Sequence, residues 1–311
     1  MASGYKILLY YKYTKVENPE ALLAWHRAVC ELLGLKGRIL IAKEGINGTV
    51  EGTVENTEKY KEMLREIGKD EATKMMGKYG NIEFKESEGT GSAFPKMKIK
   101  VRNEIVSLHL GEDDVDPNEI TGKHLSPDEL KRWYEQNEDF VVLDMRNDYE
   151  FAVGRFKNSI NPPIENFREV PKHLEDLSKY KDKKVVTVCT GGVRCEKASG
   201  YLMKQGFKDV YQLAGGMHKY MEKHPGEDFL GTLYTFDGRI TMHFGGEREI
   251  VGKCKFCGAM TERYENCARS ECNSRMVCCE KCIALDVTPW CSDKCKMIVY
   301  KDEQRIPSRA I

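Results

Sequence analysis

The chain has 311 residues and 12 cysteines, and its 49 lysine and arginine side chains balance 49 aspartates and glutamates. At about 150 residues per domain, this length predicts two domains or three small ones. A composition of 41% hydrophobic and 32% charged residues excludes a disordered chain. No apolar run approaches the ~18 residues of a membrane-spanning helix, so we expect no membrane association and a cytoplasmic location. In a reducing cytosol, so many cysteines indicate metal binding or catalysis rather than disulfides.

Residues 1–110 alternate strand and helix patterns. Strands are expected at 5–13, 38–42, 49–54, 81–85 and 96–110, and helices at 19–33 and 56–67. The segment Lys43-Glu44-Gly45-Ile46-Asn47-Gly48 is expected to be a turn. The order β-α-β-β-α-β predicts an α+β domain of the ferredoxin-like class, arranged as in acylphosphatases but without their catalytic loop. An acidic stretch then opens a predicted linker over 111–125.

Residues 126–223 carry a different pattern. Ser126-Pro127-Asp128-Glu129 is a capping box with proline at the first helical position, so a helix is expected to begin there. Short apolar strands (140–143, 185–188 and 210–213) alternate with helices (126–136, 165–177, 196–205 and 217–223). This alternation predicts an α/β domain with a parallel sheet covered on both faces. In the remaining region, 224–311, two β runs flank Asp237-Gly238, which predicts a two-residue hairpin ahead of a cysteine-rich module.

One loop of the α/β domain carries a candidate nucleophile. Cys189 ends a β run and is followed by Thr190, Gly191, Gly192, Val193 and Arg194 before a helix that we expect near Cys195. Backbone N–H groups and the helix N-terminus should lower the pKa of the Cys189 thiol, and Arg194 should add a positive charge at the rim. Phosphatase loops of the Cys-x5-Arg type are one residue longer, so this loop suits a persulfide sulfur better than a phosphate. An inert buried thiol is the alternative for Cys189. We expect Cys195 to begin the helix rather than to resolve a persulfide as a disulfide.

The C-terminal region has cysteines in four close pairs, which is the spacing that tetrahedral zinc requires. The eight candidate ligands are Cys254, Cys257, Cys267, Cys272, Cys279, Cys282, Cys291 and Cys295. They predict two closed, structural zinc sites, with an iron–sulfur cluster as the alternative. The spacing leaves open which pairs share a metal, and Cys30 and Cys278 have no assigned role.

A basic stripe marks the last strand of the first domain. Lys96, Lys98, Lys100 and Arg102 alternate with apolar residues, so the four cations share one face of a strand. This stripe is either a contact surface for phosphates or a sheet edge that lysines protect from aggregation.

The loop 189–194, the upstream segment 141–151 and Leu213-Ala214-Gly215-Gly216-Met217 resemble a rhodanese domain, with Gly154-Arg155-Phe156 as a departure. Combined with Lys43-Glu44-Gly45-Ile46-Asn47-Gly48, with Cys195-Glu196-Lys197-Ala198 and with the eight-cysteine tail, the chain resembles the rhodanese-type, oxygen-dependent tRNA uridine hydroxylases. The resemblance covers about residues 5–295. It implies hydroxylation of the wobble uridine of tRNA at C5, with molecular oxygen as co-substrate and Cys189 as the essential residue.

The residues themselves do not indicate hydroxylation, and no flavin or haem site is visible in the sequence. A sulfurtransferase acting on tRNA or on a small acceptor is the alternative. A non-catalytic binding module is disfavoured by the intact loop. Asp144 and Arg146 are expected to form a structural ion pair rather than to act in catalysis. The oligomeric state is left open.

Overall fold

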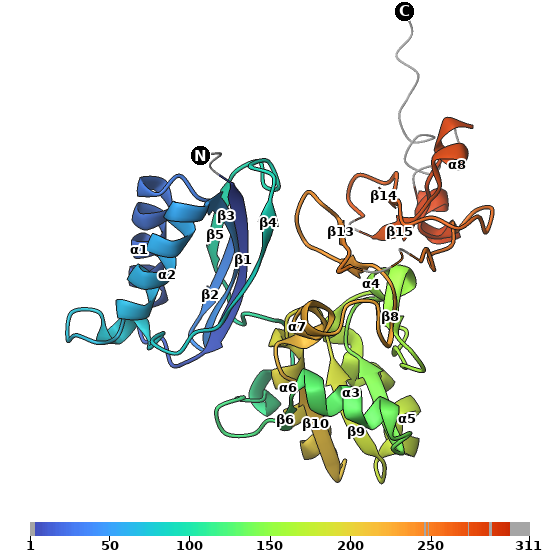
Figure 1. The fold of residues 1–311 in the computed structure, drawn as a ribbon, viewed down its shortest axis with the longest axis horizontal. Helices are drawn as coiled ribbons and strands as arrows, with labels where there is room; N and C mark the ends of the chain where they lie inside the picture. The colour runs from blue at the N-terminus through green and yellow to red at the C-terminus, as the bar shows by residue number, and fades with distance from the viewer. Residues whose placement is uncertain (1–3, 246, 248, 273, 286–287, 299–311) are drawn as a thin grey trace, which may run out of the picture.

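The computed structural model describes residues 4–245, 247, 249–272, 274–285 and 288–298, so residues 299–311 of the predicted C-terminal region lie outside it. The chain forms an N-terminal α/β sandwich, a central α/β unit and a C-terminal region of short strands (Figure 1). Among the described residues, no helix has both the length and the apolar character needed to span a bilayer.

The N-terminal part is a five-stranded sheet with two helices on one face. Its elements are β1 (Tyr5–Tyr13), α1 (Pro19–Leu32), β2 (Lys36–Ala42), β3 (Gly45–Thr53), α2 (Val54–Glu66), η1 (Lys74–Met76), β4 (Phe84–Gly89) and β5 (Met97–Val101). The strand order is β4-β1-β3-β2-β5, in which β5 pairs parallel to β2 and the other pairs are antiparallel. This is the predicted ferredoxin-like arrangement with one additional edge strand.

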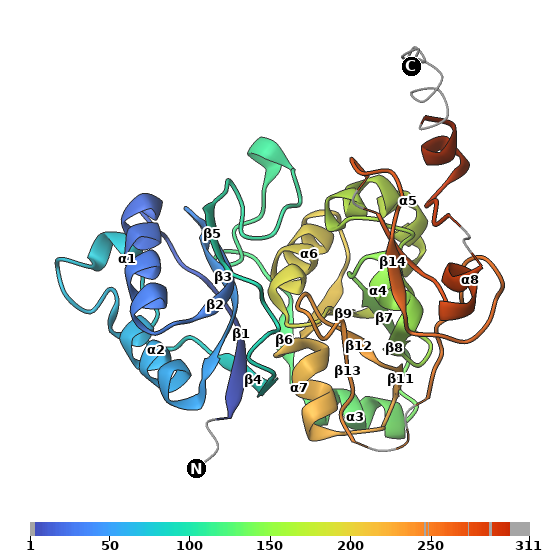
Figure 2. The same cartoon turned by 90° about the horizontal axis from the view of Figure 1, so that it is seen from above.

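The alternation along β1 sends its side chains to two different environments. Leu8 and Tyr10 are buried in the core with residues of α1 and α2, whereas Leu9 and Tyr11 line a cavity on the opposite side. In both views of the ribbon, α1 and α2 lie on the side of the sheet away from the rest of the molecule (Figures 1 and 2). The helix-free face is therefore available to form a site with the other two parts.

The central part is built on a four-stranded, wholly parallel sheet of order β6-β10-β9-β7, as the α/β pattern predicts. Its elements are η2 (Gly111–Asp113), β6 (Lys123–Leu125), α3 (Pro127–Glu135), β7 (Phe140–Asp144), α4 (Asp148–Val153), β8 (Gly154–Phe156), η3 (Phe167–His173), α5 (Leu174–Leu177), η4 (Ser178–Tyr180), β9 (Lys184–Val188), α6 (Val193–Lys204), β10 (Asp209–Leu213) and α7 (Gly216–Lys223). Two apolar clusters pack on the sheet. Strand β6 lies within the predicted linker and forms an edge of this sheet.

The C-terminal region consists of short two-stranded pairs and one helix. Its elements are β11 (Phe229–Gly231), β12 (Leu233–Tyr234), β13 (Thr241–Met242), β14 (Tyr264–Asn266), β15 (Arg275–Val277) and α8 (Glu280–Ala284). Strand β11 pairs with β8 of the central part, whereas β12 pairs with β13 and β14 with β15.

Several local predictions were wrong. The predicted turn 43–48 is shorter, because Ala42 pairs with Gly45 and the strand β3 already begins at Gly45. The predicted helix 165–177 is mainly the 3-10 helix η3, which contains Pro171 and therefore lacks the N–H donor of a regular helix. The helix expected near Cys195 is present, although it begins two residues earlier, at Val193. Asp237-Gly238 is not a two-residue turn, because Tyr234 pairs with Thr241 and a wider loop connects them.

Candidate functional site

The loop that follows β9 holds the Cys189 sulfur at the wall of a cavity. The Gly192 N–H donates a hydrogen bond of 3.2 Å to the Cys189 Sγ. Gly192 has a φ of +100°, and a Cβ on Gly191 would lie 2.9 Å from Leu9 of the N-terminal sheet. The close approach of the Leu9 side chain favours glycine at position 191, whereas the backbone conformation itself favours glycine at position 192.

The surroundings of Cys189 favour its thiolate. Burial raises the pKa of Cys189, but a hydrogen bond from Cys195, the charge of Arg194 and the N–H groups of these two residues outweigh it and lower the pKa to about 6. Burial raises the pKa of Cys195, so this thiol stays protonated and can act as the donor. Cys195 lies in the first turn of α6, where it acts on Cys189 through this hydrogen bond.

Arg194 does not stand free at the rim as the sequence suggested. Its side chain is buried and forms a two-fold ion pair with Glu150, with Nη1–Oε1 at 2.6 Å and Nη2–Oε2 at 2.9 Å. Nη2 also donates to the Thr190 hydroxyl at 3.3 Å. Glu150 was not among the residues expected at the site, because its only local signal, a position three residues after Asn147, is that of an ordinary capping box at the start of α4. The Arg194–Glu150 pair holds the loop 189–194 against α4, and it keeps the positive charge of Arg194 near the Cys189 sulfur.

Asp144 and Arg146 form the expected structural pair. Arg146 Nη2 lies 2.7 Å from Asp144 Oδ2, and both side chains are fully buried. The same nitrogen donates to the Gly154 carbonyl at 2.6 Å, which ties the end of β7 to β8.

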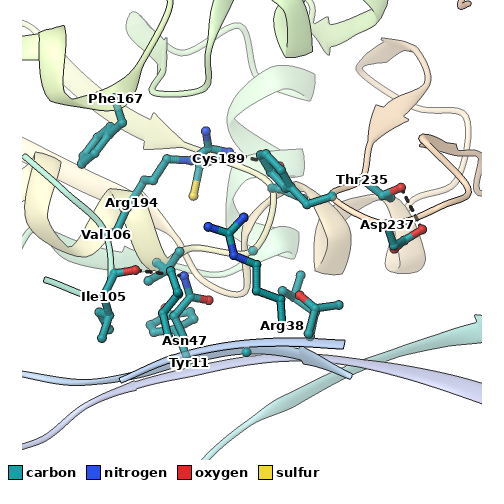
Figure 3. Close-up of a pocket in the computed structure, with 18 of the residues that line it drawn as sticks. Tyr11, Arg38, Asn47, Ile105, Val106, Phe167, Cys189, Arg194, Thr235 and Asp237 are labelled. Atoms are coloured by element: carbon teal, nitrogen blue, oxygen red, sulfur yellow. Dashed lines mark hydrogen bonds between the residues drawn. The ribbon is translucent and has the colours of Figure 1, made fainter. Parts of the chain in front are cut away.

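The cavity, of about 430 Å³, is formed by all three parts of the chain. The sheet supplies Tyr11, Arg38 and Asn47, the central part supplies the Cys189 loop, and the segment after β12 supplies Phe236. Figure 3 shows the Cys189 sulfur directed toward the sheet on which Tyr11 and Asn47 lie. This volume lies within the range of small-ligand pockets.

Two further groups near the site have shifted pKa values. His218 lines the cavity, and burial lowers its pKa to about 4, so its imidazole is neutral at physiological pH. Lys85 of β4 is buried 5.0 Å above the Tyr11 ring. Burial lowers the pKa of Lys85 to about 8, although the charges of Glu83 and Cys189 oppose this change.

The domains are fixed to one another by the two residues that follow Cys195. Glu196 accepts a hydrogen bond of 3.0 Å from the Tyr11 hydroxyl. Lys197 is fully buried, and its ammonium lies 2.8 Å from Glu44, 2.9 Å from Glu104 and 2.8 Å from Asp114. The Cys-Glu-Lys-Ala segment therefore joins the loop to the N-terminal sheet.

The loop between β12 and β13, residues 235–240, supplies the part of the cavity wall that comes from the C-terminal region. Arg239 pairs with Asp237 at 2.7 Å, and its Nη1 donates to Ser87 Oγ of β4 at 2.9 Å. The Gly238 N–H donates to the Ala93 carbonyl at 2.8 Å. The C-terminal region thereby contacts the same N-terminal part that docks on α6.

The basic stripe borders the cavity. Arg102 lines it directly, and Lys98 is the register partner of Arg38, which also lines it. Because paired residues on adjacent strands share a face, Lys98 and Lys100 lie on the cavity side of the sheet. Lys96 precedes β5 and is exposed. No carboxylate pairs with Arg38 or Arg102 among the described residues.

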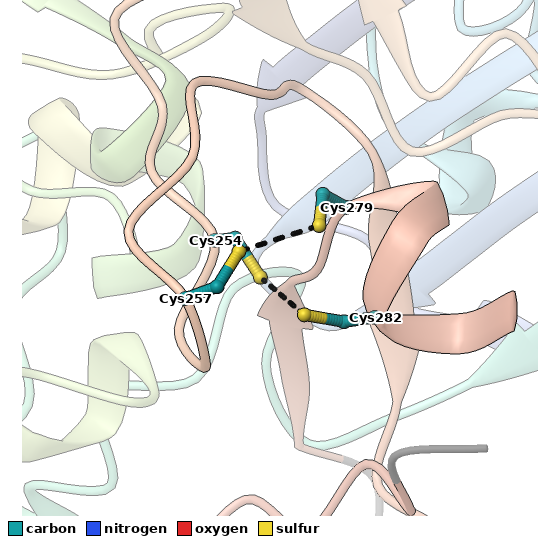
Figure 4. A group of neighbouring side chains, drawn as sticks. All are labelled: Cys254, Cys257, Cys279 and Cys282. Atoms are coloured by element: carbon teal, nitrogen blue, oxygen red, sulfur yellow. Dashed lines mark hydrogen bonds between the residues drawn. The ribbon is translucent and has the colours of Figure 1, made fainter. Parts of the chain in front are cut away.

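The structure places the eight tail cysteines in two groups of four. Each group combines alternate pairs along the chain: Cys254, Cys257, Cys279 and Cys282 in one (Figure 4), and Cys267, Cys272, Cys291 and Cys295 in the other. Four of the Sγ–Sγ distances within these groups lie between 3.4 and 3.8 Å. Tetrahedral zinc with bonds of about 2.3 Å sets its sulfurs about 3.8 Å apart, so both groups fit a metal of this kind. Cys278 belongs to neither group, and Cys30 is buried in the N-terminal core.

The parallel sheet, the loop with a single activated cysteine and the flanking parts define a protein of the rhodanese class with two additional domains. Residues 126–223 match the family described as rhodanese-like domain. Residues 5–105 match the UPF0176 acylphosphatase like domain, and residues 230–296 match the family described as Rhodanase C-terminal.

Curated relatives extend the similarity to nearly the whole chain. The tRNA uridine(34) hydroxylase of Bacillus thuringiensis (strain Al Hakam) is 48% identical over 300 residues, which cover 94% of this chain and 89% of the relative. That of Bacillus licheniformis is 48% identical over 288 residues, 90% of this chain and 85% of the relative. Among solved structures, a rhodanese-like domain protein from Staphylococcus aureus is 32% identical, covers 32% of this chain and 90% of that chain, and has a TM-score of 0.28. The chain belongs to the tRNA uridine(34) hydroxylase family.

Proposed function

We propose that this protein is an enzyme that hydroxylates the wobble uridine, position 34, of tRNA at C5, with molecular oxygen as co-substrate, and that it acts in the cytoplasm where its substrate resides. The observation that carries the proposal is the placement of Cys189 at the wall of a cavity that all three parts of the chain enclose. The family relationship supplies the reaction and the substrate. In this reading Cys189 is the catalytic residue, with Thr190, Gly191, Gly192, Val193 and Arg194 forming its loop.

The chain's own residues prepare the cysteine for this role. The Gly192 N–H and the Cys195 thiol stabilise the thiolate of Cys189, and the Arg194–Glu150 pair holds the loop in place. The neutral imidazole of His218 is available at the cavity wall to accept or donate a proton.

The test is an assay of unmodified tRNA under isotopically labelled oxygen gas, followed by mass spectrometry of nucleoside 34. Labelled 5-hydroxyuridine is expected with the wild type and not with Cys189→Ser. Cys30→Ala, which changes a buried thiol of the N-terminal core, is the matched control and should retain activity. Sulfur in the nucleoside, or thiosulfate turnover without tRNA, would replace this proposal with the sulfurtransferase alternative, which the rhodanese-type loop also suits.

We further propose that Lys96, Lys98, Lys100 and Arg102 contact the tRNA backbone. These residues lie on or beside the cavity-facing side of the sheet, where they extend the positive charge of Arg38 outward. Phosphate contacts of this kind provide affinity that falls with salt.

We also propose that the two cysteine groups are structural zinc sites with no open position for substrate. Thiolate ligands in two sets of four, with the observed sulfur spacings, are what closed zinc sites use. Metal analysis of the purified protein should give about two zinc ions per chain, and iron in their place would favour clusters instead.

A further inference from the structure

The wall of the cavity opposite Cys189 carries an amide whose orientation is fixed. Asn47 lies on β3 between Tyr11 of β1 and Leu40 of β2, and all three side chains line the cavity. The Asn47 Nδ2 donates a hydrogen bond of 3.2 Å to the Ile105 carbonyl. A carbonyl oxygen only accepts, so this bond determines which end of the amide carries the nitrogen.

Ile105 is itself held in place. Its N–H donates to Glu44 Oε1 at 2.6 Å, and Glu44 Oε2 lies 2.8 Å from the buried ammonium of Lys197. A series of contacts therefore connects the Lys197 ammonium, through Glu44 and the backbone of Ile105, to the Asn47 amide. Within the described part of the chain, no hydrogen bond uses the Asn47 Oδ1 or its second Nδ2 hydrogen, so one acceptor and one donor remain for a ligand.

We propose that Asn47 recognises the uracil base, with Oδ1 accepting from N3–H and Nδ2 donating to O2; this rests on the proposed tRNA uridine substrate. In uracil, C5 lies across the ring from C2, so a base held by its N3 and O2 edge turns C5 toward the opposite wall. That wall carries Cys189 (Figure 3). Asn47 therefore acts as a specificity residue that also sets the direction of the reacting carbon.

The same contact discriminates against cytosine. Cytosine has a lone pair at N3 where uracil has a hydrogen, so it would oppose the Asn47 Oδ1 with a second acceptor. The Ile105 bond prevents the amide from turning over to compensate without losing that bond.

The cavity also fits a single nucleotide rather than a helix. At about 430 Å³ it is of the size of a small-ligand pocket, so a base must leave its stack to reach Cys189. Arg38, on the strand next to Asn47, and Arg102 at the end of β5 lack carboxylate partners among the described residues and suit the flanking phosphates.

The test measures binding to the Cys189→Ser protein, so that no turnover is needed. The probes are three labelled anticodon stem–loop RNAs that differ at position 34: uridine, cytidine and 3-methyluridine, which lacks the N3 hydrogen. We expect the uridine RNA to bind about tenfold more tightly than the other two, the effect of about 1.4 kcal/mol. Adding Asn47→Ala should reduce the preference to within about twofold, whereas adding Asn81→Ala, an exposed asparagine outside the cavity lining, should leave it unchanged.

Equal binding of the three RNAs by the Cys189→Ser protein, or a preference that survives Asn47→Ala, would overturn the inference, as would no binding of any of them. The comparison of RNAs needs no change at Asn47, so it holds even if that variant folds poorly. A failure of labelled-oxygen incorporation by the wild type would reject the proposed function while leaving the binding preference measurable. Incorporation without any base preference would reject only the role of Asn47.

Discussion

Lys197 offers the sharpest test of how the cavity is assembled. Its ammonium is fully buried and lies within 2.9 Å of three carboxylates, which belong to the β2–β3 turn, the segment after β5 and the segment before β6. The three carboxylate side chains are between 12% and 31% exposed, so water screens them only in part. Replacing Lys197 by methionine keeps the apolar stem of the side chain but leaves three like charges facing one another.

The expected cost is at the lower end of what breaking a buried ion pair gives, about 3 kcal/mol, because the carboxylates retain some contact with water. At about 2–4 °C per kcal/mol, the first thermal transition should fall by about 6–12 °C at pH 7.5. Lys208→Met is the matched control. It removes an exposed lysine that pairs with Asp182, and such a surface pair contributes little to stability because water and salt screen it.

The pH dependence of this variant has a definite sign. Without Lys197, mutual repulsion raises the pKa values of the carboxylates in the folded state above their unfolded values, so lowering the pH to 5 stabilises the variant. The wild type should change less. Burial raises the pKa of Glu44, so this group favours folding as the pH falls. Burial alone would raise the pKa of Glu104, but hydrogen bonds from the Leu108 N–H and from Lys197 lower it overall. The stability that Glu104 contributes to the folded state is therefore lost as the pH falls.

Differential scanning calorimetry at pH 7.5 and pH 5, on the wild type and both variants, measures these changes. The gap between wild type and Lys197→Met should narrow at pH 5. A Lys197→Met transition that matches the Lys208→Met control at pH 7.5, or a gap that stays constant between the two pH values, would refute the role assigned to Lys197.

Three further predictions concern the cysteine, the metals and the basic edge. The rate of Cys189 alkylation by iodoacetamide, followed by peptide mass spectrometry, should rise with pH around a midpoint of about 6. Cys195→Ala should move this midpoint upward, because the Cys189 thiolate loses a hydrogen-bond donor. An unchanged midpoint would contradict the hydrogen bond from Cys195 to Cys189. The double variant of Cys254 and Cys279 to serine should retain about one zinc per chain, because both residues belong to one group; loss of both ions would indicate sequential pairing. Lys98→Glu should weaken tRNA binding and flatten its dependence on salt, measured by fluorescence anisotropy; unchanged binding would leave the lysine as edge protection.

The local patterns of the sequence were sufficient for the fold class. The alternation along β1, the capping box at Ser126 and the short apolar strands of the central part each depend on a few neighbouring residues, and the structure contains the predicted sandwich and parallel sheet. The errors lie where a distant contact overrides the local preference. Gly45 and Asn47 have the composition of a turn, but pairing with Tyr13 and Tyr11 of β1 extends them into a strand.

The features of the candidate site also fall into two groups: those that local sequence patterns indicate and those that depend on contacts between distant residues. The sequence by itself indicated the Cys189 loop as a candidate site and the eight tail cysteines as candidate metal ligands, because both depend on short spacings that chemistry restricts. Only the tertiary structure decided that Glu150 is the partner of Arg194, that alternate cysteine pairs share a group, and that Asn47 faces Cys189 across a cavity. These relations join residues far apart in the chain. Their geometry follows from how the three parts pack together, which no local periodicity encodes.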